Sequence, residues 1–340
     1  MSILLVGCGY WGKNWAKTLA KLDALGAICE PSPPLQATLK QTYPDIAIYN
    51  TLEEALQHPG ITGCVLATPV VTHTPVAKTC LLAGKHVLVE KPLTLDPTEA
   101  GTLVALAKQE NLILGVGHLM VYQPALLKLQ SLISEGELGD ILSVQCTRIN
   151  LGKVRNEENV WWSLAPHDLS ILAMLFSAIG ESFDAINAIK MTPLARPGIE
   201  DAVFAQFETP SGKNASIHVS WLSPEKRHET VVIGSRKIAV FEDTQPADQK
   251  LSIMDYDLKR SEEGFGDITR GEFTPVSYET PKDDLLTLEA KAFLNAIASS
   301  QGSNAAISLQ NDGENGLQVV QMLDKVQQML NTRQPSLSVR

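Results

Sequence analysis

The 340-residue sequence has no run of about 18 uncharged apolar residues, the length that a membrane-spanning helix needs. Its first apolar run, Ser2–Val6, is too short for the core of a signal peptide and is followed at once by Gly7. We therefore expect neither a membrane span nor a signal peptide, and we expect a cytoplasmic protein.

The sequence also has no run of lysine and arginine, and its net charge is −10. Residues 1–120 contain 8 of the 28 basic and 9 of the 38 acidic side chains, so the excess of acid lies in the rest of the chain. A nucleic acid would need a basic face to neutralise its phosphates. We therefore expect no nucleic-acid partner, whereas a small anion remains compatible with a local site.

Cysteines are few and form no motif. The five are odd in number, show no C-x-x-C spacing and lie mostly inside apolar runs: Cys8, Cys29, Cys64, Cys80 and Cys146. This usage is typical of buried thiols in a reducing compartment. His, Cys, Asp and Glu form no cluster with metal-ligand spacing, and no G-x-S-x-G is present. We therefore expect no metal site and no acyl-transfer hydrolase.

Residues 1–120 alternate short apolar runs with segments of helical periodicity. The expected strands are Ile3–Val6, Ala27–Glu30, Ile46–Tyr49, Gly63–Ala67, His86–Val89 and Leu112–Val116. The expected helices are Trp11–Leu22, Leu52–Gln57, His73–Ala83 and Pro97–Gln109. Such alternation produces right-handed βαβ units and a parallel sheet covered on both faces. We therefore predict an α/β fold whose first domain, residues 1–120, is a doubly wound parallel sheet.

From residue 121 the pattern changes to that of an α+β domain, which we extend to residue 335. Ala215–Trp221 alternates in period two between apolar and polar side chains, which is typical of an antiparallel sheet with one open face. Further expected strands are Ile141–Asn150, Ala202–Glu208, Val231–Ile233, Ile238–Phe241 and Leu251–Met254. The expected helices are Pro124–Ser134, Pro166–Ser177, Leu285–Ala298 and Gly313–Leu330. We therefore predict a large, mainly antiparallel open sheet in this domain.

The sequence Gly7-Cys8-Gly9-Tyr10-Trp11-Gly12 follows the first strand and opens the first helix. Gly7 permits a tight turn, Gly9 lets the backbone approach a diphosphate, and Gly12 lets helix and strand pack closely. The second strand ends in Glu30, where a carboxylate accepts hydrogen bonds from both ribose hydroxyls and repels a 2′-phosphate. The pattern predicts a Rossmann site for NAD rather than NADP. The alternatives are glycines that serve only the turn and an ordinary surface acid at position 30.

The strand His86–Val89 ends in Glu90, Lys91 and Pro92. Ligands of open α/β sheets bind beyond the carboxyl ends of the strands, so Lys91 is expected to point into the cofactor crevice. A partly desolvated amine beside a positive nicotinamide has a lowered pKa and exchanges a proton with a substrate hydroxyl. We expect a cis peptide bond before Pro92. The equally weighted alternative is a solvated Glu–Lys pair.

These motifs together resemble the glucose–fructose oxidoreductase/inositol dehydrogenase (Gfo/Idh/MocA) family over nearly the whole chain. The likeness rests on the glycine turn, Ala67-Thr68-Pro69 with His73, the Glu90-Lys91-Pro92 triplet, and Pro166-His167-Asp168 at an expected helix start. It implies an NAD-dependent oxidoreductase of a sugar or polyol, with the proton handled by Lys91 and His167. The residues that it implies for cofactor binding are Gly7, Gly9, Tyr10, Trp11, Gly12, Glu30, Thr68, Pro69, His73, Glu90 and Lys91. A structural role is the alternative for His73.

A polar segment, Asn150–Asn156, precedes the candidate histidine. Arginine grips a carboxylate or phosphate, and asparagine serves hydroxyls or an acetamido group. With Gly117–Ala125 and Trp221–Arg227, this segment resembles the UDP-N-acetylglucosaminuronate 3-dehydrogenases, which act in surface polysaccharide synthesis. The resemblance implies oxidation at C3 of a nucleotide-linked sugar. Its implied substrate contacts are Lys91, Tyr122, Lys153, Arg155, Asn156, Ser163 and His167. The alternatives are solvated loop cations and a Tyr122 that caps a helix.

Ser163 departs from the family pattern, because many members have an aspartate four positions before the histidine. A serine cannot stabilise an imidazolium as a carboxylate does, so we expect His167 to be the weaker base and Lys91 to carry more of the proton transfer. Asp168 is adjacent in sequence, but helix neighbours point about 100° apart, so it need not replace the missing acid. The alternative for His167 is a helix N-terminal residue that packs on the sheet.

Two other functions fit the sequence: a free-sugar or inositol dehydrogenase of the same family, and a non-catalytic NAD-binding regulator. The open face of the second sheet, with Trp221 and its neighbours, would be a large apolar patch for a monomer. We therefore expect a homodimer or homotetramer whose ligand is a small sugar or sugar nucleotide.

Overall fold

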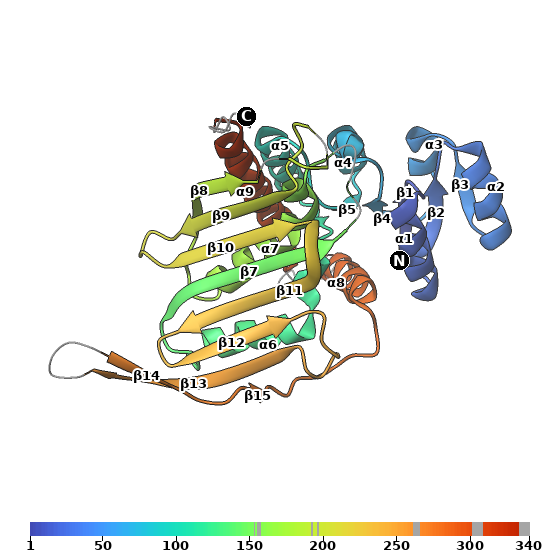
Figure 1. The fold of residues 1–340 in the computed structure, drawn as a ribbon. Helices are drawn as coiled ribbons and strands as arrows, with labels where there is room; N and C mark the ends of the chain where they lie inside the picture. The colour runs from blue at the N-terminus through green and yellow to red at the C-terminus, as the bar shows by residue number, and fades with distance from the viewer. Residues whose placement is uncertain are drawn as a thin grey trace. The chain divides into compact units, whose positions relative to one another are not determined.

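The computed structural model describes residues 1–152, 154, 158–191, 193–195, 197–260, 266–300 and 309–332 (Figure 1). The chain divides into two compact units. The first unit contains Met1–Leu119 and Asp283–Gln321, and the second contains Met120–Lys282 and the residues from Met322 onward. The single boundary predicted at residue 120 lies close to the end of the first segment, but a late segment, Asp283–Gln321, also belongs to the first unit.

Six strands form the sheet of the first unit, in the order β3-β2-β1-β4-β5-β6. They are β1 (Ser2–Val6), β2 (Leu25–Cys29), β3 (Ala47–Tyr49), β4 (Ile61–Leu66), β5 (His86–Val89) and β6 (Leu114–Val116). Every neighbouring pair is parallel. The doubly wound sheet predicted from the sequence is confirmed. Its order reverses between β1 and β4, the place where such sheets bind ligands at the carboxyl ends of the strands.

Helices cover both faces of this sheet because its strands are apolar on both sides. In β1, Leu4 and Val6 lie in one core, and Ile3 and Leu5 lie in the other. The helices are α1 (Tyr10–Lys21), α2 (Pro33–Thr42), α3 (Leu52–Leu56), α4 (His73–Leu82), α5 (Pro97–Gln109), α8 (Leu285–Ser300), the short η1 (Val70–Thr72) and the start of α9 (Gly313–Thr332). Within the described part of the chain, no helix is long and apolar enough to cross a membrane.

The late segment joins the first unit through these cores. Phe293 and Ile297 of α8 lie in the same core as Trp15 of α1, and Val320 of α9 lies in the opposite core. Apolar spacing predicted both helices. It did not predict which sheet they would cover, because an amphipathic helix does not specify its partner.

Among the described residues of the second unit, nine strands form one sheet, in the order β14-β13-β12-β11-β7-β10-β9-β8, with β15 beside β13. They are β7 (Ile141–Leu151), β8 (Asp184–Lys190), β9 (Ala202–Glu208), β10 (Asn214–Ser220), β11 (Leu222–Gly234), β12 (Lys237–Glu242), β13 (Leu251–Arg260), β14 (Gly266–Arg270) and β15 (Thr274–Pro275). β7 and β10 pair in parallel, and the other described pairs are antiparallel. The mainly antiparallel sheet predicted from the sequence is confirmed.

Helices α6 (Pro124–Ser134) and α7 (Val160–Ser177) pack on one face of this sheet, behind it in Figure 1. The alternation predicted for β10 is present, because Ala215, Ile217 and Val219 are buried and Ser216 and His218 are partly exposed. One face of each central strand is therefore covered by helices and the other is open.

Trp221 is not part of an exposed apolar patch, so that expectation was wrong. The side chain is 2% exposed, and its indole N–H donates to the carboxylate of Asp201. The exposed apolar side chains of this sheet include Ile189 of β8 and Phe204 of β9 instead.

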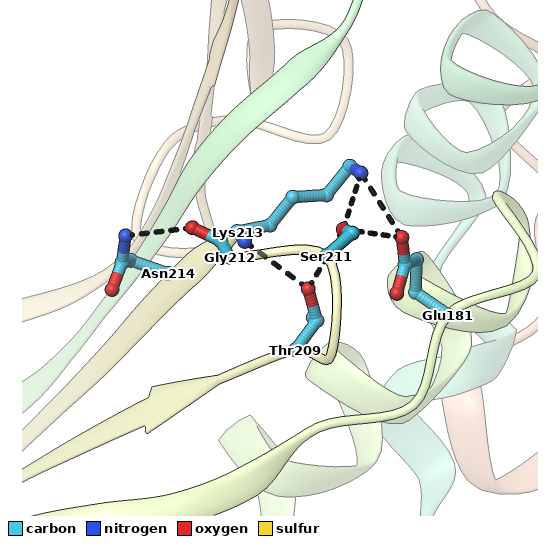
Figure 2. Close-up of polar contacts among 6 residues, drawn as sticks. All are labelled: Glu181, Thr209, Ser211, Gly212, Lys213 and Asn214. Carbon is cyan, nitrogen blue, oxygen red and sulfur yellow. Dashed lines mark hydrogen bonds and ion pairs between the residues drawn. The ribbon is translucent and has the colours of Figure 1, made fainter.

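A polar network closes the turn between β9 and β10 (Figure 2). Oε1 of Glu181 accepts hydrogen bonds from Oγ of Ser211 at 2.6 Å and from Nζ of Lys213 at 3.0 Å. Oγ1 of Thr209 accepts from the backbone N–H of Lys213 at 3.1 Å. Gly212 has φ +83°, which a glycine adopts without strain. These contacts hold the hairpin on which α7 packs.

Candidate active site

The first strand of the first unit ends in a turn built on three glycines. Gly7 has φ +84°, and a Cβ there would meet the carbonyl oxygen of Ala67 at 2.9 Å. A Cβ at Gly12 would lie 2.2 Å from the carbonyl oxygen of Gly7, so only glycine lets α1 approach β1 this closely. A Cβ at Gly9 would meet nothing within 4 Å. The turn is therefore packed on its protein side and open at Gly9.

The open position at Gly9 adjoins the N-terminus of α1. Gly9 is the N-cap residue of α1. Because glycine has no side chain, no side-chain cap from this residue occupies the N–H groups of the first helical turn. Tyr10 and Trp11 begin the helix and are 86% and 38% exposed. An open glycine beside N–H groups at the positive end of a helix suits a diphosphate.

Glu30 lies at the end of β2, beside the glycine turn, and is buried. Its Oε2 accepts the backbone N–H of Cys8 at 2.8 Å, and its Oε1 accepts that of Ser32 at 2.9 Å. The alternative of an ordinary surface acid is therefore wrong. A carboxylate has about four lone-pair sites, so each oxygen is able to accept a further bond from a ribose hydroxyl.

The loop after β4 contains Thr68 and Pro69 and leads through η1 into α4. Oγ1 of Thr72 donates to Oγ1 of Thr68 at 2.8 Å or to the carbonyl of Pro69 at 2.7 Å, which closes the loop on itself. His73, the first residue of α4, is 1% exposed. Its Nε2 lies 3.0 Å from the carbonyl oxygen of Thr68, and its Nδ1 lies 2.9 Å from that of Pro92. Both ring nitrogens therefore face the backbone.

The loop after β5 contains the Glu90-Lys91-Pro92 triplet. Oε1 of Glu90 accepts the indole N–H of Trp15 at 2.7 Å, and burial raises the pKa of the Glu90 carboxyl. The peptide bond between Lys91 and Pro92 is cis, as expected, and Lys91 is partly buried. Trp15 therefore holds the Glu90 carboxylate inside the first unit, while Lys91 stays partly exposed at the end of β5.

His118, which follows β6, is a polar residue of this site that sequence reasoning did not single out. It is 1% exposed, and its Nδ1 lies 2.8 Å from Oδ1 of Asn315. Burial and, to a smaller extent, the nearby charge of Lys91 together lower its pKa to about 4, against the opposing effect of the hydrogen bond with Asn315. The ring is therefore neutral at neutral pH.

Glu289 of α8 is a second buried polar residue that the sequence motifs did not mark. Its Oε1 accepts from Nδ2 of Asn311 at 2.8 Å, and it is 1% exposed. Burial and the charge of Glu90 raise its pKa well above the usual range. Asn315, Glu289 and Asn311 all come from the late segment of the first unit, and no short-range pattern connects them to the motifs at the strand ends.

In the second unit, α7 carries the candidate histidine. The sequence predicted a helix that begins at Pro166, but α7 begins earlier, capped by Asn159, whose Oδ1 accepts the N–H of Trp162 at 3.1 Å. Pro166 is inside the helix, so His167 is not a helix N-terminal residue. Ser163 and His167 lie one turn apart on the same side of α7. Ser163 is buried and His167 is partly exposed.

Asp168, next to His167, is paired with an arginine of the sheet. Its Oδ2 lies 3.0 Å from Nε of Arg148, and its Oδ1 lies 2.9 Å from Nη2 of the same side chain. The two side chains are 1% and 7% exposed. The carboxylate of Asp168 is therefore engaged by β7, in agreement with the expectation that it need not replace the acid missing at Ser163.

The remaining predicted substrate contacts divide into two groups. Tyr122 is buried at the end of η2 (Leu119–Tyr122). Lys153, Arg155 and Asn156 lie outside the described residues. In the part of the chain that the structure describes, no three His, Cys, Asp or Glu side chains are grouped so as to hold a metal ion.

Comparison with known protein families assigns both parts of the chain to the same family. The model of the GFO/IDH/MocA oxidoreductase family with an NAD-binding Rossmann fold matches residues 1–118, and the model of the GFO/IDH/MocA C-terminal domain matches residues 126–240. The chain belongs to the GFO/IDH/MocA family. It is an oxidoreductase and its cofactor is NAD, which confirms two predictions made from the sequence.

Three relatives within this family indicate its range. The uncharacterized oxidoreductase YdgJ of Escherichia coli is 27% identical over 95% of this chain and 93% of its own length. An inositol 2-dehydrogenase of Mycolicibacterium smegmatis is 31% identical over 49% of each chain. The UDP-N-acetylglucosamine 3-dehydrogenase of Acidithiobacillus ferrooxidans is 25% identical over 86% of this chain and 88% of its own length. A solved structure of the last enzyme covers 97% of both chains with a TM-score of 0.79 at 22% identity.

The residues of the first unit fit the cofactor of this GFO/IDH/MocA protein. The diphosphate would occupy the open position at Gly9, and the adenosine ribose would meet Glu30 at the end of β2. The glycine turn is closely packed at Gly7, against Ala67, and at Gly12, against Gly7, whereas Gly9 leaves room for a nucleotide.

Proposed function

We propose that this chain oxidises the C3 hydroxyl of a nucleotide-linked amino-uronic sugar of the UDP-N-acetylglucosaminuronate type, with NAD, in surface polysaccharide synthesis. The observation that carries the proposal is Lys91, an amine held by a tight turn at the carboxyl end of β5, the edge at which a doubly wound sheet binds its cofactor. The relative named UDP-N-acetylglucosamine 3-dehydrogenase, aligned over 86% of the chain, supports the nucleotide link and position C3.

The first unit would bind the cofactor through the strand ends and the glycine turn. Bound NAD supplies a nicotinamide that accepts a hydride. The residues assigned to this binding are Gly7, Gly9, Tyr10, Trp11, Gly12, Glu30, Thr68, Pro69, Glu90 and Lys91. His73 shapes the site rather than contacting the cofactor, because both its ring nitrogens face backbone carbonyls.

Lys91 and His167 would handle the proton. As the hydride leaves C3, the 3-hydroxyl loses its proton to one of these side chains and the carbinol becomes a ketone, so the product is a 3-keto sugar nucleotide. Ser163 cannot stabilise a charged His167 as a carboxylate would, so Lys91 takes the larger share. In addition to Lys91 and His167, we assign substrate contacts to Tyr122, Lys153, Arg155 and Asn156.

A free-sugar or inositol dehydrogenase is the second candidate, favoured by the inositol 2-dehydrogenase relative at 31% identity. That likeness extends over only half of the chain. A non-catalytic NAD-binding regulator is the third. It would share the glycine turn and Glu30 but would not depend on Lys91.

A substrate panel separates these candidates. Purified protein is incubated with NAD and, in turn, UDP-N-acetylglucosaminuronate, UDP-N-acetylglucosamine, free N-acetylglucosamine and myo-inositol, and NADH absorbance is followed. We expect the fastest oxidation with the uronate. Preference for the neutral UDP-sugar would remove the uronate from the proposal, and turnover of only free sugar or inositol would favour the second candidate.

Replacement of Lys91 tests the reaction itself. We expect Lys91→Ala to lower kcat at least about a hundredfold, because the hydroxyl proton loses its acceptor, while NAD still binds. Lys78→Ala, at an exposed position of α4 in the same unit, is the control and should retain wild-type kcat. Equal activity of the Lys91→Ala and Lys78→Ala variants would contradict a catalytic amine.

A further inference from the structure

His73 connects two loops that emerge from neighbouring strands. Thr68 follows β4 and Pro92 follows β5, and the two strands are paired in the sheet. One imidazole lies within hydrogen-bond distance of a backbone carbonyl from each loop, at 3.0 Å and 2.9 Å. The ring is 1% exposed, so water does not compete for these contacts. His73 is therefore a buried bridge between the Thr68 loop and the turn that contains Lys91.

The chemistry of the bridge is asymmetric. A carbonyl oxygen only accepts hydrogen bonds, and a neutral imidazole has a single N–H. A neutral ring therefore hydrogen-bonds only one of the two carbonyls. Donation from Nδ1 to the carbonyl of Pro92 is enough for the bridge, because His73 follows the Thr68 loop directly in the chain. Because both nitrogens are turned to the backbone, the ring acts on bound groups only through the loops that it holds.

We propose that His73 is a positioning residue that fixes the Lys91–Pro92 turn against the Thr68 loop and so sets where the Lys91 amine stands. This inference rests on the proposed function, in which Lys91 accepts the hydroxyl proton. A lysine has a long flexible side chain, so its reach to a reacting atom depends on how firmly its backbone is held. A displacement of about 1 Å at a reacting group costs on the order of a hundredfold in rate.

The Thr68 loop is suited to be the fixed side of the bridge. Thr72 ties it internally, because its backbone N–H donates to the carbonyl of Pro69 at 2.9 Å and its hydroxyl donates to Oγ1 of Thr68 or to the same carbonyl. The backbone N–H of Ala67 donates to the carbonyl of Val6 at 2.9 Å, which attaches the loop to the end of β1. The Lys91 turn is thereby linked, through His73 and the Thr68 loop, to β1, the strand that precedes the glycine turn.

The kinetic test compares three replacements. His73→Leu fills the space without a donor, and His73→Asn retains an N–H donor near the position of Nδ1, toward Pro92. We expect His73→Leu to lower kcat about tenfold or more while the NAD dissociation constant changes less than about threefold, and we expect His73→Asn to recover part of the loss. His58→Leu is the matched control, since His58 is a partly buried histidine of the same unit that bonds Tyr49 at 2.9 Å.

A second readout does not depend on the substrate. Lysines are methylated with ¹³C-formaldehyde, and the Lys91 signal is assigned by its absence in Lys91→Arg. We expect His73→Leu to move the chemical shift and titration midpoint of the Lys91 signal and to leave those of Lys78 unchanged. If the wild-type protein oxidised no sugar, the proposed function would fail while a moved Lys91 signal still supported the bridge.

The result that overturns the inference is a folded His73→Leu protein whose Lys91 signal equals that of the wild type. A loss of NAD affinity equal to the loss of kcat would also overturn it, because His73 would then act on the cofactor. If His73→Leu does not fold, the same NMR comparison is made with His73→Phe, which keeps a ring but has no nitrogen to donate, and an unchanged Lys91 signal there decides against the bridge.

Discussion

At the scale of single residues, Glu30 links the glycine turn to the choice of cofactor. Its carboxylate accepts N–H groups from Cys8 in the turn and Ser32 after β2, so its position is fixed before any nucleotide binds. A carboxylate held there favours a ribose with two hydroxyls and opposes a 2′-phosphate. We therefore expect the side chain that orders the turn also to favour NAD over NADP.

We predict that Glu30→Ala weakens NAD binding about tenfold and narrows the preference for NAD over NADP. Both backbone N–H groups lose their acceptor, and a 2′-phosphate no longer meets a negative charge. Calorimetric titration with NADH and NADPH measures both effects. Glu54→Ala removes an exposed acid of α3 in the same unit and should change neither constant. A cofactor preference unaltered in Glu30→Ala would contradict this role.

The motif residues of the candidate site could be predicted from the sequence, whereas the buried residues that surround them could not. Gly7, Glu30 and Lys91 lie within short patterns whose spacing has a chemical reason, and the structure gives each a geometry compatible with that reason. His118 and Glu289 are separated by a long stretch of chain and show no such spacing. They are buried through tertiary packing, which a single sequence does not reveal.

At the scale of secondary structure, the periodicity of apolar residues and the turn residues predicted most helices and strands but not all. The helix Pro124–Ser134 was predicted with its observed bounds. The helix Pro33–Thr42 was not among the predicted elements, although its two opening prolines fit the first turn of a helix. The start of α7 was predicted at Pro166, but the helix begins at Val160 and Pro166 lies inside it.

The Arg148–Asp168 pair fixes α7 to β7, and we predict that breaking it is costly. Arg148→Met or Asp168→Leu alone leaves the other buried charge without its partner and should lower the unfolding midpoint by roughly 10 °C. The double variant Arg148→Met/Asp168→Leu should lose less than the sum of the two, because no buried charge remains.

Thermal unfolding followed by circular dichroism checks the prediction. The control is Lys325→Met, which removes an ion pair with Asp184 whose side chains are 41% and 57% exposed. Exposed pairs contribute little, so its midpoint should stay close to that of the wild type. Additive losses in the double Arg148/Asp168 variant would show that the two side chains do not stabilise the fold as a pair.

At the scale of the whole molecule, the open face of the second sheet carries exposed apolar side chains. Ile189, Phe204 and His218 are neighbours across β8, β9 and β10, and the rings of Phe204 and His218 stack with centroids 3.9 Å apart. Val203 and Ala205, on either side of Phe204, are buried and point to the opposite face. An exposed apolar strip of this kind on a sheet is typical of a contact between protein chains.

We predict that the protein is a homodimer, or a homotetramer built from such dimers, joined through this strip. Light scattering at micromolar concentration should give a mass at least twice the 36.9 kDa of one chain. Phe204→Glu places a charge in the centre of the strip and should shift the mass toward 36.9 kDa without unfolding the protein, because Phe204 is 48% exposed and is not a core residue. Leu82→Glu, at a position 62% exposed on the first unit, is the control and should leave the mass unchanged. A wild-type mass of one chain would contradict the assembly, and a Phe204→Glu protein that kept its oligomeric mass would move the interface to another face.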